Sequence, residues 1–295
     1  MKTSYYPGCT LKTKARNLED AALASLAALS IEVEELERWN CCGAVYSLAD
    51  DDLIHQVAPV RNLVRAKDAG AGRVVTLCAQ CYNVLARGNL LMREDEDKRR
   101  TLNMFMEEET DYHGEVEVVH YLDLLREEAG WDRLRRQVRV PLEGLRVAPF
   151  YGCALLRPHE IGVGGQGNRP TIMQDLLTAL GATPVEFPLM QECCGAYEIV
   201  ANPAQSLERS ARVVASALGC GVDAMVLSCP LCEYNLGKKQ GAAARSVPAL
   251  PVYYFTQLLA VALGLGPASC RFDLNMVGAR ALLERRGFLD ASIAV

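Results

Sequence analysis

The sequence has little of what marks a membrane, secreted or nucleic-acid-binding protein. Its longest apolar run, residues 255–266, is shorter than a bilayer span requires. The opening stretch MKTSYYPGCT contains no apolar core of a secretory signal. The net charge is −5, with 31 basic and 36 acidic residues, which does not fit a basic nucleic-acid-binding surface. We therefore expect no membrane span, no nucleic-acid partner and a cytoplasmic location.

Cysteine, by contrast, is abundant. The chain has 12 cysteines in 295 residues, which is below the density of small disulfide scaffolds. A chain of this length, half of it hydrophobic, buries enough surface to fold without disulfides. In a reducing compartment, so many thiols indicate metal binding or redox chemistry.

The cysteines form two matching sets of five, and Cys220 and Cys270 belong to neither. Each set reads as one cysteine, a gap of 31 or 39 residues, Cys-Cys-Gly, a gap of 34 or 33 residues, and Cys-x-x-Cys. The first set is Cys9, Cys41, Cys42, Cys78 and Cys81, and the second is Cys153, Cys193, Cys194, Cys229 and Cys232. Such a repeat indicates that the chain is a duplication.

The flanking sequences repeat as well. VVTLCAQCYNVL at 74–85 corresponds to MVLSCPLCEYNL at 225–236, and VHYLDLL at 119–125 corresponds to VYYFTQLLA at 252–260. The basic stretch at 133–144 suits a junction between the two copies. We expect a first domain over residues 1–140 and a second over residues 141–295.

Short β-branched and aromatic runs predict four strands in each half. In the first half these are residues 3–7, 31–36, 73–77 and 116–122, and in the second half 145–151, 183–188, 224–228 and 251–255.

Helical stretches lie between the expected strands. They include residues 17–29, with Asn17 as N-cap, and residues 51–70, where Pro59 predicts a kink or break. The charged run at 93–100 is expected on the solvated face of one long helix. Alternating strands and helices predict an α/β fold of two similar halves, each a small parallel sheet flanked by helices. Because most of the cysteines follow strands, they are expected to converge beyond the carboxyl ends of those strands.

Three uses of five converging thiols compete. A disulfide or dithiol does not explain why the same five recur together. A structural zinc site and an ordinary cubane cluster each take four ligands. The fifth thiol is then either a packed bystander or a ligand of an iron–sulfur centre of unusual geometry, and spacing alone leaves this choice open.

The motifs resemble a known family. CCGAVYSLADDD and ECCGAYEIVANP, each with an upstream cysteine and a downstream Cys-x-x-Cys, resemble the duplicated CCG domain. The catalytic subunit, designated B, of heterodisulfide reductases has motifs similar to YYPGC and FYGCALLRP. The resemblance to that subunit spans nearly the whole chain. It implies two noncubane [4Fe-4S] clusters, each ligated by one set of five cysteines, with a substrate disulfide cleaved between them.

The resemblance also implies partners. A ferredoxin-like subunit, designated C, would supply electrons to this chain, and a flavoprotein subunit, designated A, would lie upstream of it in the electron-transfer chain. Iron–sulfur subunits of lactate and glycolate oxidases share the domain, so an electron-transfer subunit of a flavin dehydrogenase or sulfur-oxidation complex is the alternative. The run GVGGQG at 162–167 lacks the nucleotide-binding spacing and is interpreted as a substrate-access or interface loop.

Two polar residues follow the first cysteine of the second set. Arg157 suits an anionic disulfide, and His159 is a candidate proton donor to a departing thiolate. Lys12, Lys14 and Arg16 occupy the corresponding stretch after Cys9. Packing roles are expected for the two remaining cysteines and for His120.

Overall fold

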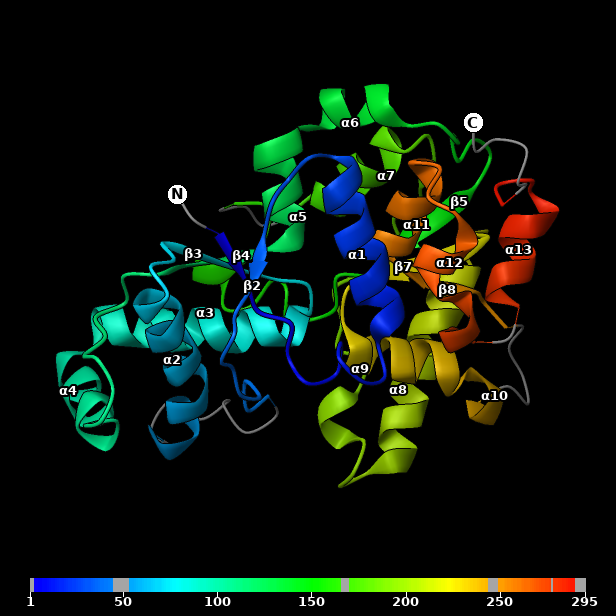
Figure 1. Cartoon of the computed structure of the whole chain (residues 1–295). Coiled ribbons are helices and arrows are strands. Elements are labelled where there is room, and N and C mark those ends of the chain that lie inside the picture. Colours follow the sequence, from blue (N-terminus) through cyan, green and yellow to red (C-terminus); the bar gives the residue numbers. More distant parts are fainter. Residues whose placement is uncertain (1–2, 45–52, 166–169, 244–248, 277, 290–295) are drawn as a thin grey trace.

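Each half of the chain forms a four-stranded parallel sheet, and the two halves lie side by side (Figure 1). The computed structural model describes residues 3–44, 53–165, 170–243, 249–276 and 278–289. The strand orders are β2-β1-β3-β4 and β6-β5-β7-β8, and every pairing is parallel. The expected α/β class with two similar halves is confirmed, whereas the boundary near residue 140 stays a prediction.

All eight expected strands are present, and most are shorter than the runs that predicted them. The first sheet contains β1 (Thr3–Tyr5), β2 (Glu34–Glu35), β3 (Arg73–Thr76) and β4 (Glu117–His120). The second contains β5 (Arg146–Pro149), β6 (Thr183–Pro184), β7 (Ala224–Leu227) and β8 (Val252–Tyr254). The central strand β7 is buried along its whole length, as a strand covered by helices on both faces must be.

Helices follow the strands in the same order in both halves. The first half has α1 (Arg16–Ala28), α2 (Leu53–Asp68), α3 (Ala79–Glu94), α4 (Glu96–Phe105), α5 (Tyr121–Leu124), η1 (Leu125–Ala129) and α6 (Trp131–Gln137). The second half begins with η2 (His159–Ile161), α7 (Ile172–Ala179), η3 (Ala196–Glu198), α8 (Pro203–Leu218), α9 (Pro230–Glu233), η4 (Tyr234–Lys238) and α10 (Gln240–Ala243). It ends with α11 (Phe255–Ala262), α12 (Pro267–Cys270), η5 (Phe272–Leu274) and α13 (Ala279–Arg285).

Three local expectations are corrected. Ala15, not Asn17, occupies the N-cap of α1, and Asn17 is buried with its amide donating to Asn275 Oδ1 at 3.0 Å. Helix α2 continues through Pro59, so the expected break is absent, whereas a kink there stays a prediction. The charged run at 93–100 spans two helices, because Asp95 ends α3 and its carboxylate accepts a hydrogen bond from the Lys98 N–H as the N-cap of α4.

The two halves exchange helix contacts. Helix α1 of the first half packs on α11 of the second, and α7 of the second packs on α5 and α6 of the first (Figure 1). Because α1 and α7 follow the first strand of their sheets, and α5 and α11 the fourth, the two contacts are equivalent. The Thr256 hydroxyl, which donates to the Leu18 carbonyl at 3.0 Å, fixes one of them.

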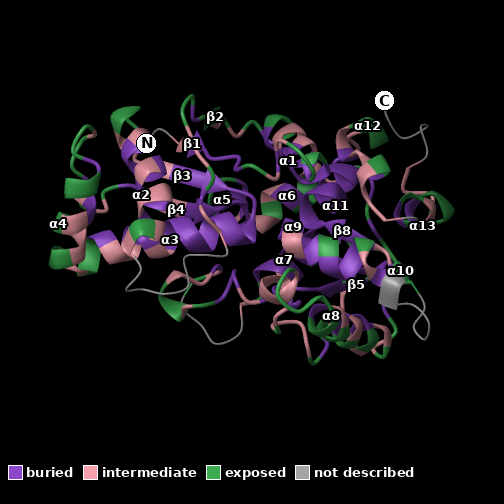
Figure 2. Ribbon diagram, turned by 90° about the horizontal axis from the view of Figure 1, so that it is seen from below, coloured by how far each residue is buried: buried purple, intermediate pink, exposed green. Residues whose placement is uncertain are grey.

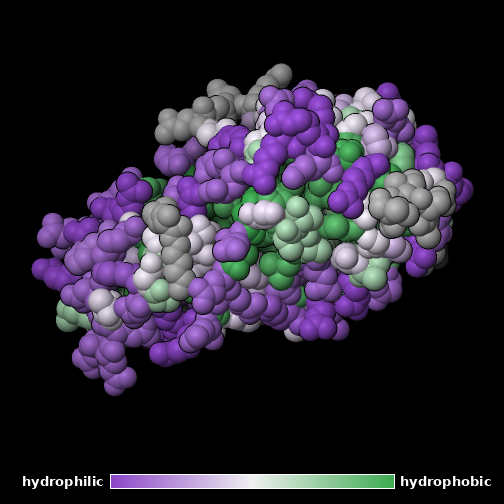
Figure 3. Space-filling model, turned by 45° about the horizontal axis from the view of Figure 1, so that its top comes forward, coloured by the Kyte–Doolittle hydropathy of each residue, from purple (hydrophilic) through white to green (hydrophobic). Residues whose placement is uncertain are grey.

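Buried side chains form one continuous core across both halves. Figure 2 shows buried residues running from β1, β3 and α3 to β8 and α11, whereas α4 and α8 have many exposed residues. On the face drawn in Figure 3, hydrophobic residues gather in a central hollow surrounded by hydrophilic ones. Among the described helices, none has the length and apolar character needed to cross a membrane.

Candidate metal centre

The ten cysteines of the two sets lie in segments that follow the first three strands of each sheet. Cys9 and Cys153 lie in turns after β1 and β5, and the two Cys-Cys pairs lie in coil after β2 and β6. The Cys-x-x-Cys motifs follow β3 and β7. All strands in a sheet are parallel, so these segments meet at one end of it, where α/β proteins bind their ligands.

Within each sheet the chain reverses its winding direction between the first and third strands, which leaves a crevice at the strand ends. Gly8 enters this crevice in the first half with a φ of +73°, and a Cβ there would lie 2.9 Å from the Cys81 sulfur. Gly152 occupies the equivalent place with a φ of +64°, and its Cβ would lie 3.6 Å from the Cys232 sulfur. The glycines therefore let the first loop of each set approach the last cysteine.

The glycine of each Cys-Cys-Gly also has a structural reason. Gly43 and Gly195 have φ values of +74° and +84°, a conformation that strains other residues. A Cβ on Gly195 would also lie 2.9 Å from the Ser206 Cα, so α8 packs directly against this loop. The Asn235 amide donates to the Cys194 carbonyl at 3.0 Å and holds the same loop from the other side.

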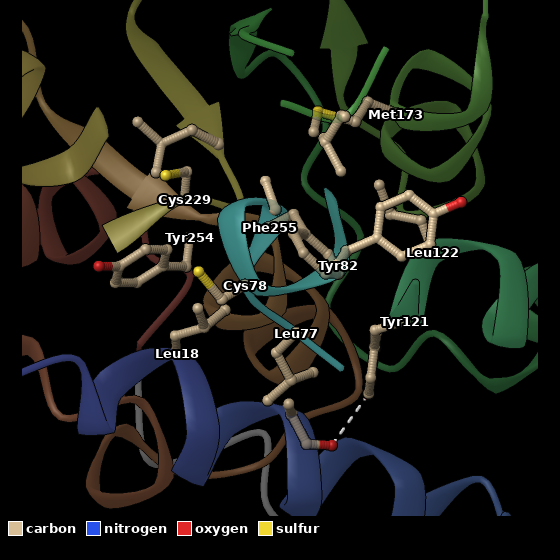
Figure 4. Packing of buried hydrophobic residues seen from close by; sticks show 14 of the residues in the cluster. Leu18, Leu77, Cys78, Tyr82, Tyr121, Leu122, Met173, Cys229, Tyr254 and Phe255 are labelled. Atoms are coloured by element: carbon tan, nitrogen blue, oxygen red, sulfur yellow. Dashed lines mark hydrogen bonds between the residues drawn. The ribbon is translucent and has the colours of Figure 1, made fainter. Parts of the chain in front are cut away.

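The two Cys-x-x-Cys motifs meet where the halves join. Cys78 and Cys229 are the N-cap residues of α3 and α9, so each Cys-x-x-Cys opens a helix. Figure 4 shows the Cys78 and Cys229 side chains coming from the two halves and lying beside the ring of Tyr254. The two thiols are close enough to perturb each other's pKa, so the two sets approach each other across the interface.

Within a set, the thiols approach one another in pairs. The Cys9 and Cys41 sulfurs lie 3.6 Å apart and are exposed, whereas the Cys42 and Cys81 sulfurs lie 3.5 Å apart and are buried. In the second half the pairs are Cys153 with Cys193 and Cys194 with Cys232, in which the neighbouring thiol raises the pKa of Cys153 and of Cys232. In the described part of the chain, no three Cys, His, Asp or Glu side chains surround a point where one metal ion would be held.

The close thiols perturb one another's pKa. The neighbouring Cys153 thiol lowers the pKa of Cys193 to about 6, helped by the backbone N–H groups of Gly195 and Ala196 and by the charge of Arg209. The same kind of contact lowers the pKa of Cys42, through Cys41 and Cys81, and of Cys229, through Cys232 and Cys78. The neighbouring thiols shift the other way: the pKa is raised for Cys41, Cys78, Cys81, Cys153 and Cys232. Each set thus contains a thiol biased toward the thiolate, the form that binds soft metals.

The start of α3 reaches across the interface. The Tyr82 hydroxyl donates to the Ile161 carbonyl at 2.6 Å, and the Asn83 amide donates to the Ala154 carbonyl at 2.9 Å. The Gln80 amide donates to the Tyr197 hydroxyl at 2.8 Å. Three side chains from the first turns of this helix therefore hold the cysteine-bearing loops of the second half.

Arg157 and His159 lie in the loop after Cys153, and both side chains are exposed. Asn83 anchors this loop through the Arg157 carbonyl, so the backbone, not the guanidinium, makes that contact. The catalytic roles of Arg157 and His159 stay predictions. In the corresponding stretch of the first half, Lys12 pairs with Glu19 at 2.7 Å and Glu35 at 2.6 Å, so its charge is already matched within the chain.

The glycine-rich loop is only partly described, because residues 166–169 lie outside the described residues. In the described part, the Gly164 N–H donates to the Asp123 carboxylate at 3.0 Å across the two halves. Burial raises the pKa of Asp123. This contact agrees with the interpretation as an interface loop.

The residues outside the two sets are buried or peripheral. Cys270 is fully buried, and burial raises its pKa to about 12. His120 is also fully buried, with its Nδ1 accepting the Leu122 N–H and its Nε2 3.1 Å from the Leu77 carbonyl. Burial lowers the pKa of His120 to about 3, so it is neutral at physiological pH. Cys220 is half-buried in the turn before β7.

Three residues near the thiols were missed by sequence reasoning. Tyr197 and Arg209 lie close to Cys193, and Asn235 holds the Cys194 loop. The position of Tyr197 three residues after a Cys-Cys pair was a usable signal. Arg209 had none, because its position depends on how α8 packs.

The fold and the site define a duplicated, cysteine-rich α/β protein. The sequence profile of the cysteine-rich domain family, CCG, matches residues 3–86 and 147–237. The chain therefore belongs to this family.

Characterised relatives align along nearly the whole chain. The 8-methylmenaquinol:fumarate reductase membrane anchor subunit of Wolinella succinogenes is 30% identical, over 95% of this chain and 98% of that protein. The subunit designated B of the ferredoxin/F(420)H(2)-dependent CoB-CoM heterodisulfide reductase of Methanosarcina acetivorans is 29% identical, over 94% of both chains. A hypothetical protein from Helicobacter pylori shares the fold, with a TM-score of 0.74 at 13% identity. The match covers 93% of this chain and 51% of the Helicobacter pylori chain, so this chain spans about half the length of that protein.

Proposed function

We propose that the chain is an iron–sulfur oxidoreductase that reduces a small disulfide to two thiols, or runs the reverse reaction, as one component of a heterodisulfide reductase-type complex. One observation carries the proposal: two matched sets of five thiols meet through Cys78 and Cys229. Relatives of similar length that are named as heterodisulfide reductase subunits support it.

The donor set fits two noncubane [4Fe-4S] clusters. Each set contains five thiols at strand ends, and each has a thiol of lowered pKa ready to bind iron: Cys42 in the first, Cys193 and Cys229 in the second. Gly8 and Gly152 leave space beside the last cysteine of each set, which a side chain would fill. We propose as ligands Cys9, Cys41, Cys42, Cys78, Cys81, Cys153, Cys193, Cys194, Cys229 and Cys232.

When bound, a pair of such clusters supplies the two electrons that cleavage of a disulfide requires, one from each. The protein contributes the positions of the ligands and the charges around them. In our proposal the positive charges of Arg209 and Arg157 attract an anionic substrate, since both side chains are exposed on the side of the second thiol set. His159 donates a proton to the departing thiolate.

The proposed partners belong to one cytoplasmic complex. A ferredoxin-like protein supplies electrons to this chain, and a flavoprotein feeds electrons to the ferredoxin-like protein. The exposed Cys9 and Cys41 offer a short path for an electron arriving at the first set.

A second candidate function has its own support. The relative from Wolinella succinogenes, at 30% identity, is named as part of a fumarate reductase and not of a disulfide reductase. In that alternative, the chain transfers electrons for a flavin dehydrogenase or a sulfur-oxidation complex and binds no disulfide.

Metal analysis of anaerobically purified protein tests the cofactor. We expect about eight iron and eight sulfide per chain, four of each for each set. Cys78→Ala and Cys229→Ala should lose iron, whereas Cys220→Ala, outside both sets, should retain it. Stoichiometric zinc without iron would refute the proposal.

A substrate test separates the two functions. The reduced protein should change its visible spectrum when a small disulfide is added. If thiols and disulfides leave the spectrum unchanged while electrons pass to a dehydrogenase, the alternative is correct. For His159, turnover of His159→Gln that equals the parent across pH 5 to 8 would remove its proposed role.

A further inference from the structure

The side chains behind the two Cys-Cys-Gly loops differ between the halves. In the second half, Asn235 follows the last cysteine of the set by three residues and is buried, with 1% of its surface exposed. Val84 follows the last cysteine of the first set by the same three residues and is also fully buried. A valine side chain forms no hydrogen bond, so only the second half has an amide at this matched position.

The backbone differs at the same point. Asn235 lies in η4, which is a π-helical segment, whereas Val84 lies within the regular α-helix α3. A π-helical turn is rare in proteins and occurs frequently at functional sites. The irregular backbone of the second half thus coincides with the buried amide.

A second matched pair differs in the same way. A Cβ on Gly195 would lie 2.9 Å from the Ser206 Cα. A Cβ on Gly43 would lie 3.5 Å from the Ala58 Cβ, so Ala58 is the equivalent neighbour of the first loop. The Asn235 amide donates to the Ser206 hydroxyl at 3.3 Å. The second half therefore has a polar pair behind its loop where the first half has an apolar pair.

The Asn235 amide also contacts a sulfur directly. Its Nδ2 donates to the Cys194 carbonyl at 3.0 Å and to the Cys194 Sγ at 3.8 Å, so its two N–H groups are shared among three acceptors. The opposite orientation would turn the amide oxygen toward that carbonyl oxygen, and neither atom can donate. Asn235 Oδ1 has no partner among the described residues, so the amide keeps both N–H groups at the loop at the expense of its oxygen.

The contact with sulfur should strengthen when the sulfur binds a metal. A thiol is a weak acceptor, whereas hydrogen bonds to charged acceptors are about twice as strong as those between neutral groups. Cys194 and Asn235 are both buried, so water does not compete for the amide. In the first set the Thr10 hydroxyl lies 3.7 Å from the Cys9 Sγ, but this contact is exposed, and a water molecule can replace the hydroxyl.

We propose that Asn235 is a positioning residue that donates a hydrogen bond to the Cys194 sulfur and thereby gives the second iron–sulfur centre a higher reduction potential than the first. The inference rests on the proposed function, because it concerns the centres that the thiols would hold. An N–H group directed at a ligand sulfur stabilises the negative charge that a centre gains on reduction. An electron that the ferredoxin-like donor gives to the first centre then passes to the second, which leaves the first oxidised and the second reduced by one electron.

Redox titration of the reconstituted full chain, followed by electron paramagnetic resonance and visible absorption, tests the proposal. The parent should show two midpoint potentials. Asn235→Val introduces the residue that the first half has at the matched position, and it should lower the higher potential and leave the other unchanged. A tenfold change in the equilibrium between the centres corresponds to about 59 mV for one electron, and we expect a shift of that order.

A matched variant separates the contact with sulfur from the packing of the loop. Ser206→Ala introduces the residue of the first half, Ala58, and keeps the Cα on which Gly195 packs. It removes one of the three acceptors and leaves the N–H group of Asn235 to the sulfur. The higher potential should therefore stay or rise in Ser206→Ala. A fall as large as in Asn235→Val would mean that the polar pair acts through the loop, and would overturn the inference.

The iron content is read first, because it distinguishes the two levels of the argument. A parent chain that takes up no iron overturns the proposed function and this inference with it. If the parent takes up iron, but Asn235→Val leaves both potentials unchanged or moves both equally, the inference alone is overturned. If Asn235→Val loses iron, Asn235→Leu, whose side chain is closer to asparagine in length, takes its place. Loss of iron in that variant too would show that the amide holds the loop, and would overturn the inference.

Discussion

Replacing Gly8 by alanine should empty one of the two proposed metal centres and spare the other. Gly8 has a φ of +73°, and its added Cβ would lie 2.9 Å from the Cys81 sulfur, a separation that real Cβ atoms essentially never show. The sulfur must therefore move out of the position in which it lies 3.5 Å from Cys42. Because Cys81 belongs to the first set only, the damage should stay in that half.

The backbone cost must be separated from the cost to the thiol. A left-handed conformation costs an alanine roughly 1–2 kcal/mol relative to glycine. Gly70, at the end of α2, has nearly the same φ of +74°, and a Cβ there would meet no atom within 4 Å. Gly70→Ala is therefore destabilised only by the left-handed backbone conformation. This effect should lower the unfolding free energy of both variants by about 1–2 kcal/mol.

The assay compares urea unfolding with iron and sulfide per chain after anaerobic reconstitution. We expect Gly70→Ala to bind as much iron as the parent, and Gly8→Ala to bind about half, because one of the two proposed four-iron centres would be lost. Gly152→Ala should have a milder effect, since its Cβ would lie 3.6 Å from the Cys232 sulfur. Full iron in Gly8→Ala, or an equal loss in Gly70→Ala, would refute the reasoning.

Three further outcomes follow from single contacts. His120 has a pKa of about 3 in the fold and 6.5 as its ordinary value, so the unfolded chain binds the extra proton between these pH values. Stability should fall by up to about 1.4 kcal/mol per pH unit as pH drops through that window, and His120→Gln should flatten the urea-measured profile. Asn235→Ala should cost about 1–3 kcal/mol by freeing the Cys194 carbonyl, and a thermal midpoint equal to the parent's would contradict this. Tyr82→Phe should cost about 1 kcal/mol in the same assay by removing the bond to the Ile161 carbonyl, and a larger loss would mean that the hydroxyl does more than bridge the halves.

The sheets could be predicted from the sequence because buried parallel strands carry an unmistakable pattern. The run at 224–228 is apolar and bounded by turn residues, and β7 is buried throughout. The helix boundaries were harder. Asp95 is a good N-cap and was visible in the sequence, yet the charged residues around it gave no apolar periodicity that separated two helices from one.

The gathering of cysteines within a half could be predicted for the same reason, since parallel strands place their carboxyl ends together. The contact between Cys78 and Cys229 could not. It depends on how one half packs on the other, and neither motif encodes the position of its twin. The same holds for Gln80 and Tyr197, which lie 117 residues apart.

The packing between the halves explains why the site belongs to the whole chain and not to either repeat. Helix α1 packs on α11, and α7 packs on α5 and α6, so each half covers part of its apolar surface with a helix of the other. A repeat separated from its partner would expose that surface to water. The helix that follows Cys78 also spans the two halves, because Tyr82 and Asn83 of α3 bind the loop that follows Cys153. Any change that loosens the contacts between α1 and α11, or between α7 and α5 or α6, should therefore move Cys78 relative to Cys229 and disturb both thiol sets before either sheet unfolds.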